Sequence, residues 1–238
     1  MTTSLPDLSD GILRMRQICS DARRRYLISL PPGFSLEQAS ELQMRMRRLV
    51  RRRSYLPKKV KLVAGLDSAY EGKIAFGAAV TVDIETMEPK ETVTARGEAA
   101  IPYVPSFLAF REAPIIFAAA MRLKKRPDVY LVDGQGYAHP RRFGLACHVG
   151  IALNAPTIGV AKSRLCGTIS EARLRDRGET IGAILQGKSG RLSYVSVGHK
   201  ISLRDATKIV SRCISAWPRD PISLAHSEAN RMKEAMTS

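Results

Sequence analysis

The segment DVYLVD at residues 128–133, followed by GQGYAHPRRFG at 134–144, contains the pattern that decides the fold. Its first part is an apolar run of strand length that ends in an acid, and its second part begins with turn residues. A helical pattern follows near 141–153, and PTIGVA at 156–161 is a second short apolar run. A strand, a helix and a strand in this order indicate parallel strands of one sheet with the helix on its face.

Three β-rich runs precede this unit and predict an antiparallel meander. They are VKLVAGLD at 60–67, KIAFGAAVTVD at 73–83 and ETVTARGEAAI at 91–101, and turn residues separate them. A helix is expected after them, at about 106–125. This order predicts the α/β class, with a mixed sheet covered by helices on both faces.

The two ends of the chain complete this prediction. Ser35 and Gln38 can form a capping box at the start of a helix. Residues 1–33 are basic and interrupted by prolines, so we expect an N-terminal extension to one domain over 34–238. The C-terminal part is expected to hold short strands at 180–186 and 191–197 and helices at 203–215 and 222–235.

The composition points to a polyanionic partner. The 238 residues include 38 Lys and Arg against 22 Asp and Glu, a formal net charge of +16. Residues 1–60 hold thirteen Lys and Arg and five Asp and Glu, about half of this excess. Nucleic acid is the leading candidate, and a solvated basic face is the alternative. Arginines near the end of the first helix also suit its dipole without any ligand.

Cysteine usage and hydropathy indicate the compartment. The four cysteines, Cys19, Cys147, Cys166 and Cys213, are far apart and show no C-x-x-C spacing, which argues against a zinc site or a disulfide framework. No segment has the ~18 to 20 uninterrupted apolar residues of a membrane helix, and the N-terminus lacks a signal-peptide core. We therefore expect a cytoplasmic protein with no membrane partner.

Two acids stand at matching places in the predicted sheet. Asp67 ends the first strand and Asp133 ends the run YLVD. If these strands are parallel neighbours, both carboxylates emerge at the edge where α/β sheets bind ligands. Two close carboxylates repel unless a cation joins them, and Mg²⁺ prefers oxygen ligands. The alternative is that each Asp caps a turn or a helix.

Two further charged residues extend this cluster. Glu112 lies in the helix after the meander, and with Asp67 and Asp133 it completes a carboxylate trio suited to metal-assisted phosphodiester hydrolysis. Lys162 ends the run PTIGVAK and can reach the same edge as Asp133. Each has an ordinary alternative, because Glu112 could pair with Arg111 and a lysine after a strand is often only a surface residue.

The loop after Asp133 has the composition of a phosphate-binding segment. Gly134 and Gly136 let the backbone turn and approach a ligand, while His139, Arg141 and Arg142 supply donors for phosphate. The alternative is a tight turn followed by a solvated helix start.

Four blocks together resemble the endonuclease V family, nucleases that act beside deaminated bases. They are VAGLDSAY at 63–70, PYVPSFLAFREAP at 102–114, PDVYLVDGQGYAHPRRFGLACHVG at 127–150 and PTIGVAKSRLCG at 156–167. The similarity spans roughly residues 35–225, most of the chain.

The resemblance implies a ribonuclease H-like fold, with the first and fourth strands as parallel neighbours. It implies a catalytic role for Asp67, Glu112, Asp133 and Lys162. It implies metal ligation by Asp67, Glu112, Asp133 and His199. It implies substrate contacts by Pro102, Tyr103, Val104, Pro105, Gly134, Gln135, Gly136, His139, Arg141 and Arg142.

In the family, the segment that matches residues 102–105 wedges between bases. Tyr103 between two prolines is a stiff aromatic, and such wedges compensate for lost stacking. From the residues alone, the segment is typical of a turn at the end of a strand.

The function implied is metal-dependent DNA repair. The resemblance implies an enzyme that uses Mg²⁺, for which Mn²⁺ can substitute, and that cuts DNA at the second phosphodiester bond 3′ to deoxyinosine, leaving 3′-hydroxyl and 5′-phosphate ends. Its partner is DNA with deaminated bases, and we expect a monomer. Two alternatives stay open: an endoribonuclease specific for inosine in RNA, and a basic binding module without catalysis.

Overall fold

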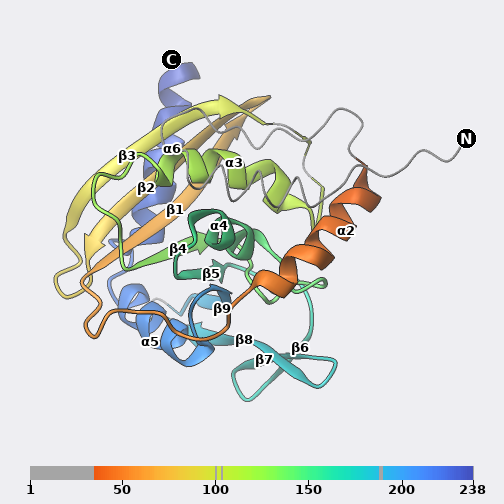
Figure 1. Ribbon diagram of the computed structural model, residues 1–238. Helices are drawn as coiled ribbons and strands as arrows, with labels where there is room; N and C mark the ends of the chain where they lie inside the picture. Colours follow the sequence, from red (N-terminus) through yellow and green to blue (C-terminus); the bar gives the residue numbers. More distant parts are fainter. Residues whose placement is uncertain (1–34, 100, 103, 188–189, 238) are drawn as a thin grey trace, which may run out of the picture.

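The computed structural model describes residues 35–99, 101–102, 104–187 and 190–237 (Figure 1). The expected extension over 1–33 lies outside the described residues. The described chain forms one mixed sheet with strand order β3-β2-β1-β4-β5-β9-β8-β7-β6. Its strands are β1 (Leu62–Glu71), β2 (Ile74–Asp83), β3 (Pro89–Glu98), β4 (Val129–Asp133), β5 (Thr157–Ala161), β6 (Thr168–Ser170), β7 (Arg173–Asp176), β8 (Glu179–Gln186) and β9 (Leu192–His199).

Parallel pairing is confined to the middle of the sheet. β1 pairs parallel with β4, and β4 pairs parallel with β5. The meander β1-β2-β3 is antiparallel on one side, and β9 begins an antiparallel region on the other. The first and fourth strands are thus parallel neighbours. This confirms the predicted class, an α/β ribonuclease H-like mixed sheet flanked by helices.

Helices cover both faces of the sheet (Figure 1). The described helices are α2 (Leu36–Met46), α3 (Leu108–Ala120), α4 (Leu145–Leu153), α5 (Leu203–Ile214) and α6 (Pro221–Thr237). α3 and α4 pack on one face in a core that includes Ala64 and Leu66, and α5 and α6 pack on the other with Val63 and Leu131. Successive strand residues therefore point to opposite cores.

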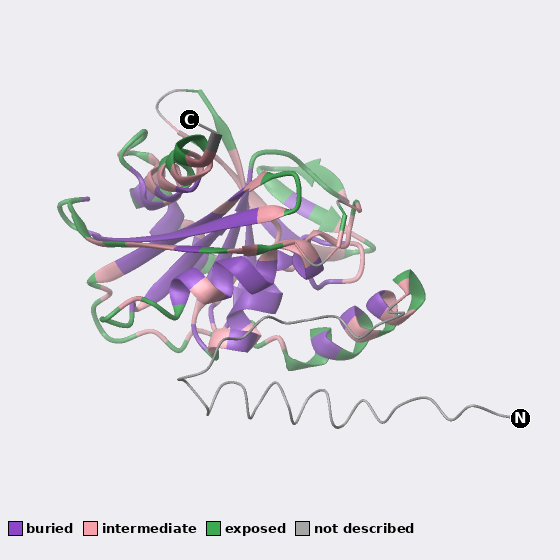
Figure 2. Cartoon of the chain, turned by 90° about the horizontal axis from the view of Figure 1, so that it is seen from above, coloured by how far each residue is buried: buried purple, intermediate pink, exposed green. Residues whose placement is uncertain are grey.

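Burial is greatest along the central strands (Figure 2). β4 and β5 are buried along almost their whole length, as expected for parallel strands covered on two sides. α6 approaches β1 closely at Gly65, where an added Cβ would lie 2.0 Å from the carbonyl oxygen of Pro221. Glycine at this position therefore allows the start of α6 to lie directly on β1.

Most predicted elements are present with shifted ends. The capping box of α2 is confirmed: the Ser35 hydroxyl accepts from the Gln38 amide at 3.3 Å, and the Gln38 side chain accepts from the Ser35 amide at 3.0 Å. The helix expected at 106–125 spans only Leu108–Ala120. The hairpin of β6 and β7 was not predicted. None of the described helices has the length and apolar character required to cross a membrane.

Candidate active site

Strand register brings Asp67 and Asp133 to the same edge of the sheet. Leu66 pairs with Val132 in the parallel β1–β4 ladder, so the next residue of each strand is one of these acids. Asp133 in turn pairs with Val160 of β5, and Lys162 follows two residues later. β1 continues past Asp67 to Glu71, so Asp67 does not end this strand as expected, but the parallel ladder with β4 ends beside it. Two acids and a lysine therefore lie together at this edge, as the sequence predicts.

A histidine from α6 joins this cluster. Nδ1 of His226 lies 2.7 Å from Oδ2 of Asp67, and Nζ of Lys162 lies 2.7 Å from Oδ2 of Asp133. One ligand atom each of Asp67, Asp133 and His226 lie within 4.8 Å of one another. Carboxylate oxygens and an imidazole nitrogen at this spacing can bind one divalent cation.

Glu112 approaches the cluster from α3. It is not one of the three grouped residues, but burial, followed by the negative charges of Asp67 and Asp133, raises its pKa to about 8. Burial and the charge of Asp67 also raise the pKa of Asp133, against the opposing hydrogen bond from Lys162. The surroundings therefore disfavour full ionisation of these acids, and a bound cation would stabilise their charged forms.

The acids also shift the pKa values of the two neighbouring basic groups, His226 and Lys162. The hydrogen bond with Asp67 raises the pKa of His226, although burial opposes this. Burial lowers the pKa of Lys162, but the hydrogen bond and charge of Asp133 outweigh it and raise that pKa overall. Both shifts therefore favour the positively charged forms of these side chains beside the acids.

His199, expected as a metal ligand, lies at the wrong end of the sheet. It pairs with Thr157 at the start of β5, whereas Lys162 follows the end of that strand. Five residues of strand separate the two positions, about 16 Å. His199 is buried, and its Nδ1 accepts from the Arg51 amide at 3.3 Å. The expected role of His199 is therefore corrected, and His226 occupies the corresponding place in the cluster.

The AHPRR loop holds a neighbouring loop in place. The carbonyl oxygen of Ser106 lies 3.0 Å from Nε2 of His139, accepts from Arg141 at 2.9 Å and accepts from Gln43 at 3.1 Å. Ser106 has a left-handed backbone with φ of 68°, and the Arg141 guanidinium lies 4.3 Å from the ring centroid of Phe107. His139 and Arg141 thus position the segment that precedes α3.

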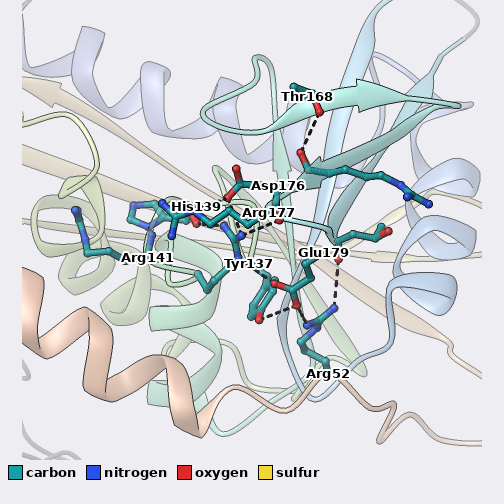
Figure 3. A network of polar contacts seen from close by, with 11 residues as sticks. Arg52, Tyr137, His139, Arg141, Thr168, Asp176, Arg177 and Glu179 are labelled. Atoms are coloured by element: carbon teal, nitrogen blue, oxygen red, sulfur yellow. Dashed lines mark hydrogen bonds and ion pairs between the residues drawn. The ribbon is translucent and has the colours of Figure 1, made fainter.

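Arg142 is bound to acids at the end of β7 and the start of β8. Its guanidinium forms ion pairs with Asp176 at 2.7 Å and Glu179 at 3.1 Å, and the side chain is only 8% exposed. Glu179 also accepts from the Tyr137 hydroxyl at 3.0 Å and pairs with Arg52 (Figure 3). The charge of Arg142 is therefore paired within the fold, and its expected contact with phosphate stays a prediction.

The glycine loop packs against its own sheet. Gly136 is buried, and an added Cβ would lie 2.2 Å from the Val197 carbonyl oxygen. Its amide donates to the Ser196 hydroxyl at 2.9 Å. Gly136 therefore lets the loop pack closely against β9, and its expected contact with substrate stays a prediction. Gly134 has a φ of 149°, which favours glycine, and the Gln135 side chain donates to the Ser163 carbonyl at 2.8 Å.

The expected wedge is described only in part. Pro102 and Pro105 are exposed and Val104 is half-buried, while Tyr103 lies outside the described residues. The Phe107 amide donates to the Val104 carbonyl at 3.0 Å and closes a turn before α3. This exposed turn is the segment held through Ser106.

Comparisons with known proteins agree on one family. A family model described as endonuclease V matches residues 44–227. The endonuclease V of Thermofilum pendens is 42% identical over 205 residues, covering 83% of this chain and 88% of that protein. The endonuclease V of Aeropyrum pernix is 40% identical over 209 residues, covering 84% and 81%.

Solved structures show the same likeness. The crystal structure of endonuclease V from Streptomyces avermitilis is 32% identical, with a TM-score of 0.78, and the match covers 90% of this chain and 100% of that one. The Ciona intestinalis endonuclease V was solved in complex with a 24mer DNA containing an inosine followed by a ribo-adenosine. It is 29% identical with a TM-score of 0.75, and the match covers 84% and 99%.

Proposed function

The chain belongs to the endonuclease V family, and from this premise we propose that it is a metal-dependent endonuclease of DNA repair. It nicks DNA at the second phosphodiester bond 3′ to deoxyinosine and leaves 3′-hydroxyl and 5′-phosphate ends. The observation that carries the proposal is the convergence of Asp67, Asp133 and His226 within 4.8 Å at one sheet edge.

The donor set fits a hard divalent cation. Asp67, Asp133 and His226 would hold it, and Glu112 would add negative charge near them. Mg²⁺ or Mn²⁺ is the proposed ion. When bound, the ion would supply positive charge to a phosphodiester and lower the pKa of water. The raised pKa values of Glu112 and Asp133 support this fit, because they arise from burial and from the neighbouring carboxylates, and a cation would oppose both effects.

In addition to the metal ion, Lys162 supplies a positive charge beside Asp133. Its ammonium holds the Asp133 carboxylate at 2.7 Å and is 57% exposed, so it also faces solvent where a phosphate would lie. An exposed ammonium can bond to a phosphate oxygen while keeping Asp133 oriented. All of these groups come from one chain, so we propose a monomer with a catalytic domain over 34–238.

Recognition of the lesion is assigned to the turn before α3. Inserting an aromatic at a base step requires a stiff support, and the Ser106 carbonyl with its three donors supplies one. A mispaired base costs less to unstack, so Tyr103 would favour damaged sites. The net charge of +16 supports general affinity for the nucleic-acid backbone.

An endoribonuclease for inosine in RNA is the second candidate. The Ciona relative was crystallised with DNA in which a ribonucleotide follows the inosine, so a member of the family binds a ribose at that position. Readout through the 2′-hydroxyl would decide between the two substrates.

Cleavage of matched substrates tests both candidates. DNA and RNA strands of one sequence, each with one hypoxanthine base and a 5′ label, are incubated with Mg²⁺, Mn²⁺ or EDTA, and products are mapped to the nucleotide. We expect a DNA nick at the second bond 3′ to the lesion, none in EDTA, and none with Asp133→Asn. A strong preference for RNA would replace the first candidate by the second. Binding without cleavage under either metal ion would instead favour the non-catalytic module.

A further inference from the structure

A cavity of about 300 Å³ opens beside the acids, on the face of the sheet that α5 and α6 cover. Asp133, Lys162 and His226 line one part of it. Arg191 and Trp217, which have no role in the proposed metal centre, line another. The cavity therefore connects the proposed catalytic groups to an aromatic and a cationic side chain.

Trp217 is the sole tryptophan of the chain, and 46% of its surface is exposed. It lies in the connection between α5 and α6. This connection is anchored at Asp220, whose carboxylate accepts from the Ile222 and Ser223 amides at 3.1 Å each. Because His226 lies on the helix that begins here, Trp217 and His226 are held by the same short segment.

Arg191 approaches the indole from the connection between β8 and β9. Its guanidinium carbon lies 5.5 Å from the ring centroid of Trp217. The positive charge of Arg191 also opposes the rise in the pKa of Lys162, so the two cations lie near each other in the cavity. The side chain of Arg191 is exposed, and no ion pair to it is found within the described residues.

Single exposed apolar side chains are common and need no special explanation. Here, however, a large flat ring and an adjacent guanidinium share a cavity with groups suited to a phosphodiester. Proteins that hold single-stranded nucleic acid use this combination, because a base stacks on the aromatic while cations bind its backbone. The volume is sufficient for one nucleotide, and the ring keeps nearly half of its surface accessible.

We propose that this cavity is a nucleotide subsite: an unstacked base of the cleaved strand, near the scissile phosphate, stacks on Trp217, and Arg191 binds its phosphate. The inference rests on the proposed nuclease function. It assigns Trp217 and Arg191 as substrate-positioning residues that hold the strand next to the metal centre.

The sole tryptophan provides a direct probe. The full chain, with Ca²⁺ in place of Mg²⁺ to suppress cleavage, is titrated with a deoxyinosine duplex, and binding is followed independently by anisotropy of a labelled strand. We expect Trp217 emission to change with saturation. In duplexes that carry 2-aminopurine at single positions 3′ or 5′ to the lesion, we expect quenching at one position, lost in Trp217→Leu.

Kinetics supply the second readout. Trp217→Leu is expected to raise KM at least about fivefold with kcat little changed, and Trp217→Phe to keep most of the affinity. Tyr55→Leu is the matched control: Tyr55 is 44% exposed and lies 5.7 Å beneath Arg51, but its amide bonds to the carbonyl of Lys200, at the opposite end of the sheet. It should leave KM unchanged.

The outcomes separate the subsite from the function. Cleavage by the wild type, with unchanged Trp217 emission in the complex and equal KM in Trp217→Leu, would overturn the subsite and leave the nuclease intact. A wild type that cleaves none of the duplexes with Mg²⁺ or Mn²⁺ would overturn the nuclease and the subsite with it.

Discussion

Nδ1 of His226 lies 2.7 Å from Oδ2 of Asp67, although 159 residues separate them in the chain. The contact exists because α6 begins directly on β1 at Gly65 and extends along the face to which Asp67 points. The hydrogen bond to Asp67 raises the pKa of His226. A cation would therefore compete with a proton for the imidazole of His226.

Replacing His226 should weaken metal binding and cleavage. We expect His226→Ala to raise the metal concentration for half-maximal cleavage at least about tenfold, because one of three grouped ligands is lost. His199→Gln is the matched control, since His199 lies at the other end of β5. Metal titrations of nicking rate measure both. Equal effects of the two substitutions would show that His226 is not a ligand.

Metal binding should release protons and strengthen as pH rises. Because the pKa of Glu112 is raised to about 8, its carboxyl is mostly protonated at pH 7 in the metal-free protein, and a cation must displace that proton. Apparent affinity should therefore increase from pH 6 and level off above about 8. Calorimetry in two buffers with different ionisation enthalpies counts the protons. Glu112→Gln should release fewer, and a binding enthalpy independent of buffer in the wild type would contradict the raised pKa.

Arg141→Met should impair cleavage at the lesion without changing metal affinity. Its guanidinium supports the Ser106 carbonyl, and a looser turn would lower kcat/KM for deoxyinosine DNA by about tenfold. Arg126→Met is the control, because Arg126 also bonds two carbonyl oxygens, those of Leu153 and Asn154, away from this turn. Parallel loss in both variants would indicate a general effect of removing a positive charge.

Arg142→Met should destabilise the fold more than it alters catalysis. The substitution removes one cation from each of Asp176 and Glu179, which keep Arg177 and Arg52 as partners. Because these acids are 23% and 36% exposed, we expect the unfolding free energy to fall by about 2 kcal/mol, less than for a fully buried pair. Lys59→Met removes an exposed pair with Glu85 and should leave the unfolding free energy almost unchanged. Urea unfolding measures both. If Arg142→Met is as stable as Lys59→Met but loses DNA affinity, Arg142 contacts substrate after all.

Acid should destabilise the protein partly through His148. This side chain is buried between Phe110 and Phe143, and burial lowers its pKa to about 4. Unfolding restores a pKa near 6.5, so the unfolded chain gains a proton first and stability falls as pH drops from about 6.5 to about 4. His148→Leu should reduce this slope by up to about 1.4 kcal/mol per pH unit. Unfolding free energies between pH 4.5 and 7.5 test it; an unchanged slope would contradict the shift.

The predicted elements are those whose signals are local. β4 and β5 are short, continuous apolar runs, and the box at Ser35 and Gln38 marks a helix start within four residues. The β6–β7 hairpin lacks such signals. β6 is exposed throughout, and its turn uses Glu171 and Ala172, both with positive φ, where glycine or asparagine would usually mark the turn.

The charged residues of the AHPRR block illustrate a limit of composition. Histidine and arginine suit a phosphate and equally suit a carbonyl or a carboxylate within the fold. His139 lies beside the Ser106 carbonyl and Arg142 is bound by Asp176 and Glu179, and all three partners lie more than 30 residues away in the chain. No spacing within the block distinguishes these uses.

By itself the sequence determined the strand and helix order, because these follow from local patterns along the chain. Its resemblance to the endonuclease V family implied that β1 and β4 are parallel neighbours, and so that Asp67 meets Asp133. Only the tertiary structure decided that His226, not His199, faces those acids and that Trp217 shares their cavity. The reason is physical: where a helix lies on a sheet depends on packing between distant segments, such as α6 against Gly65, which no local pattern reports.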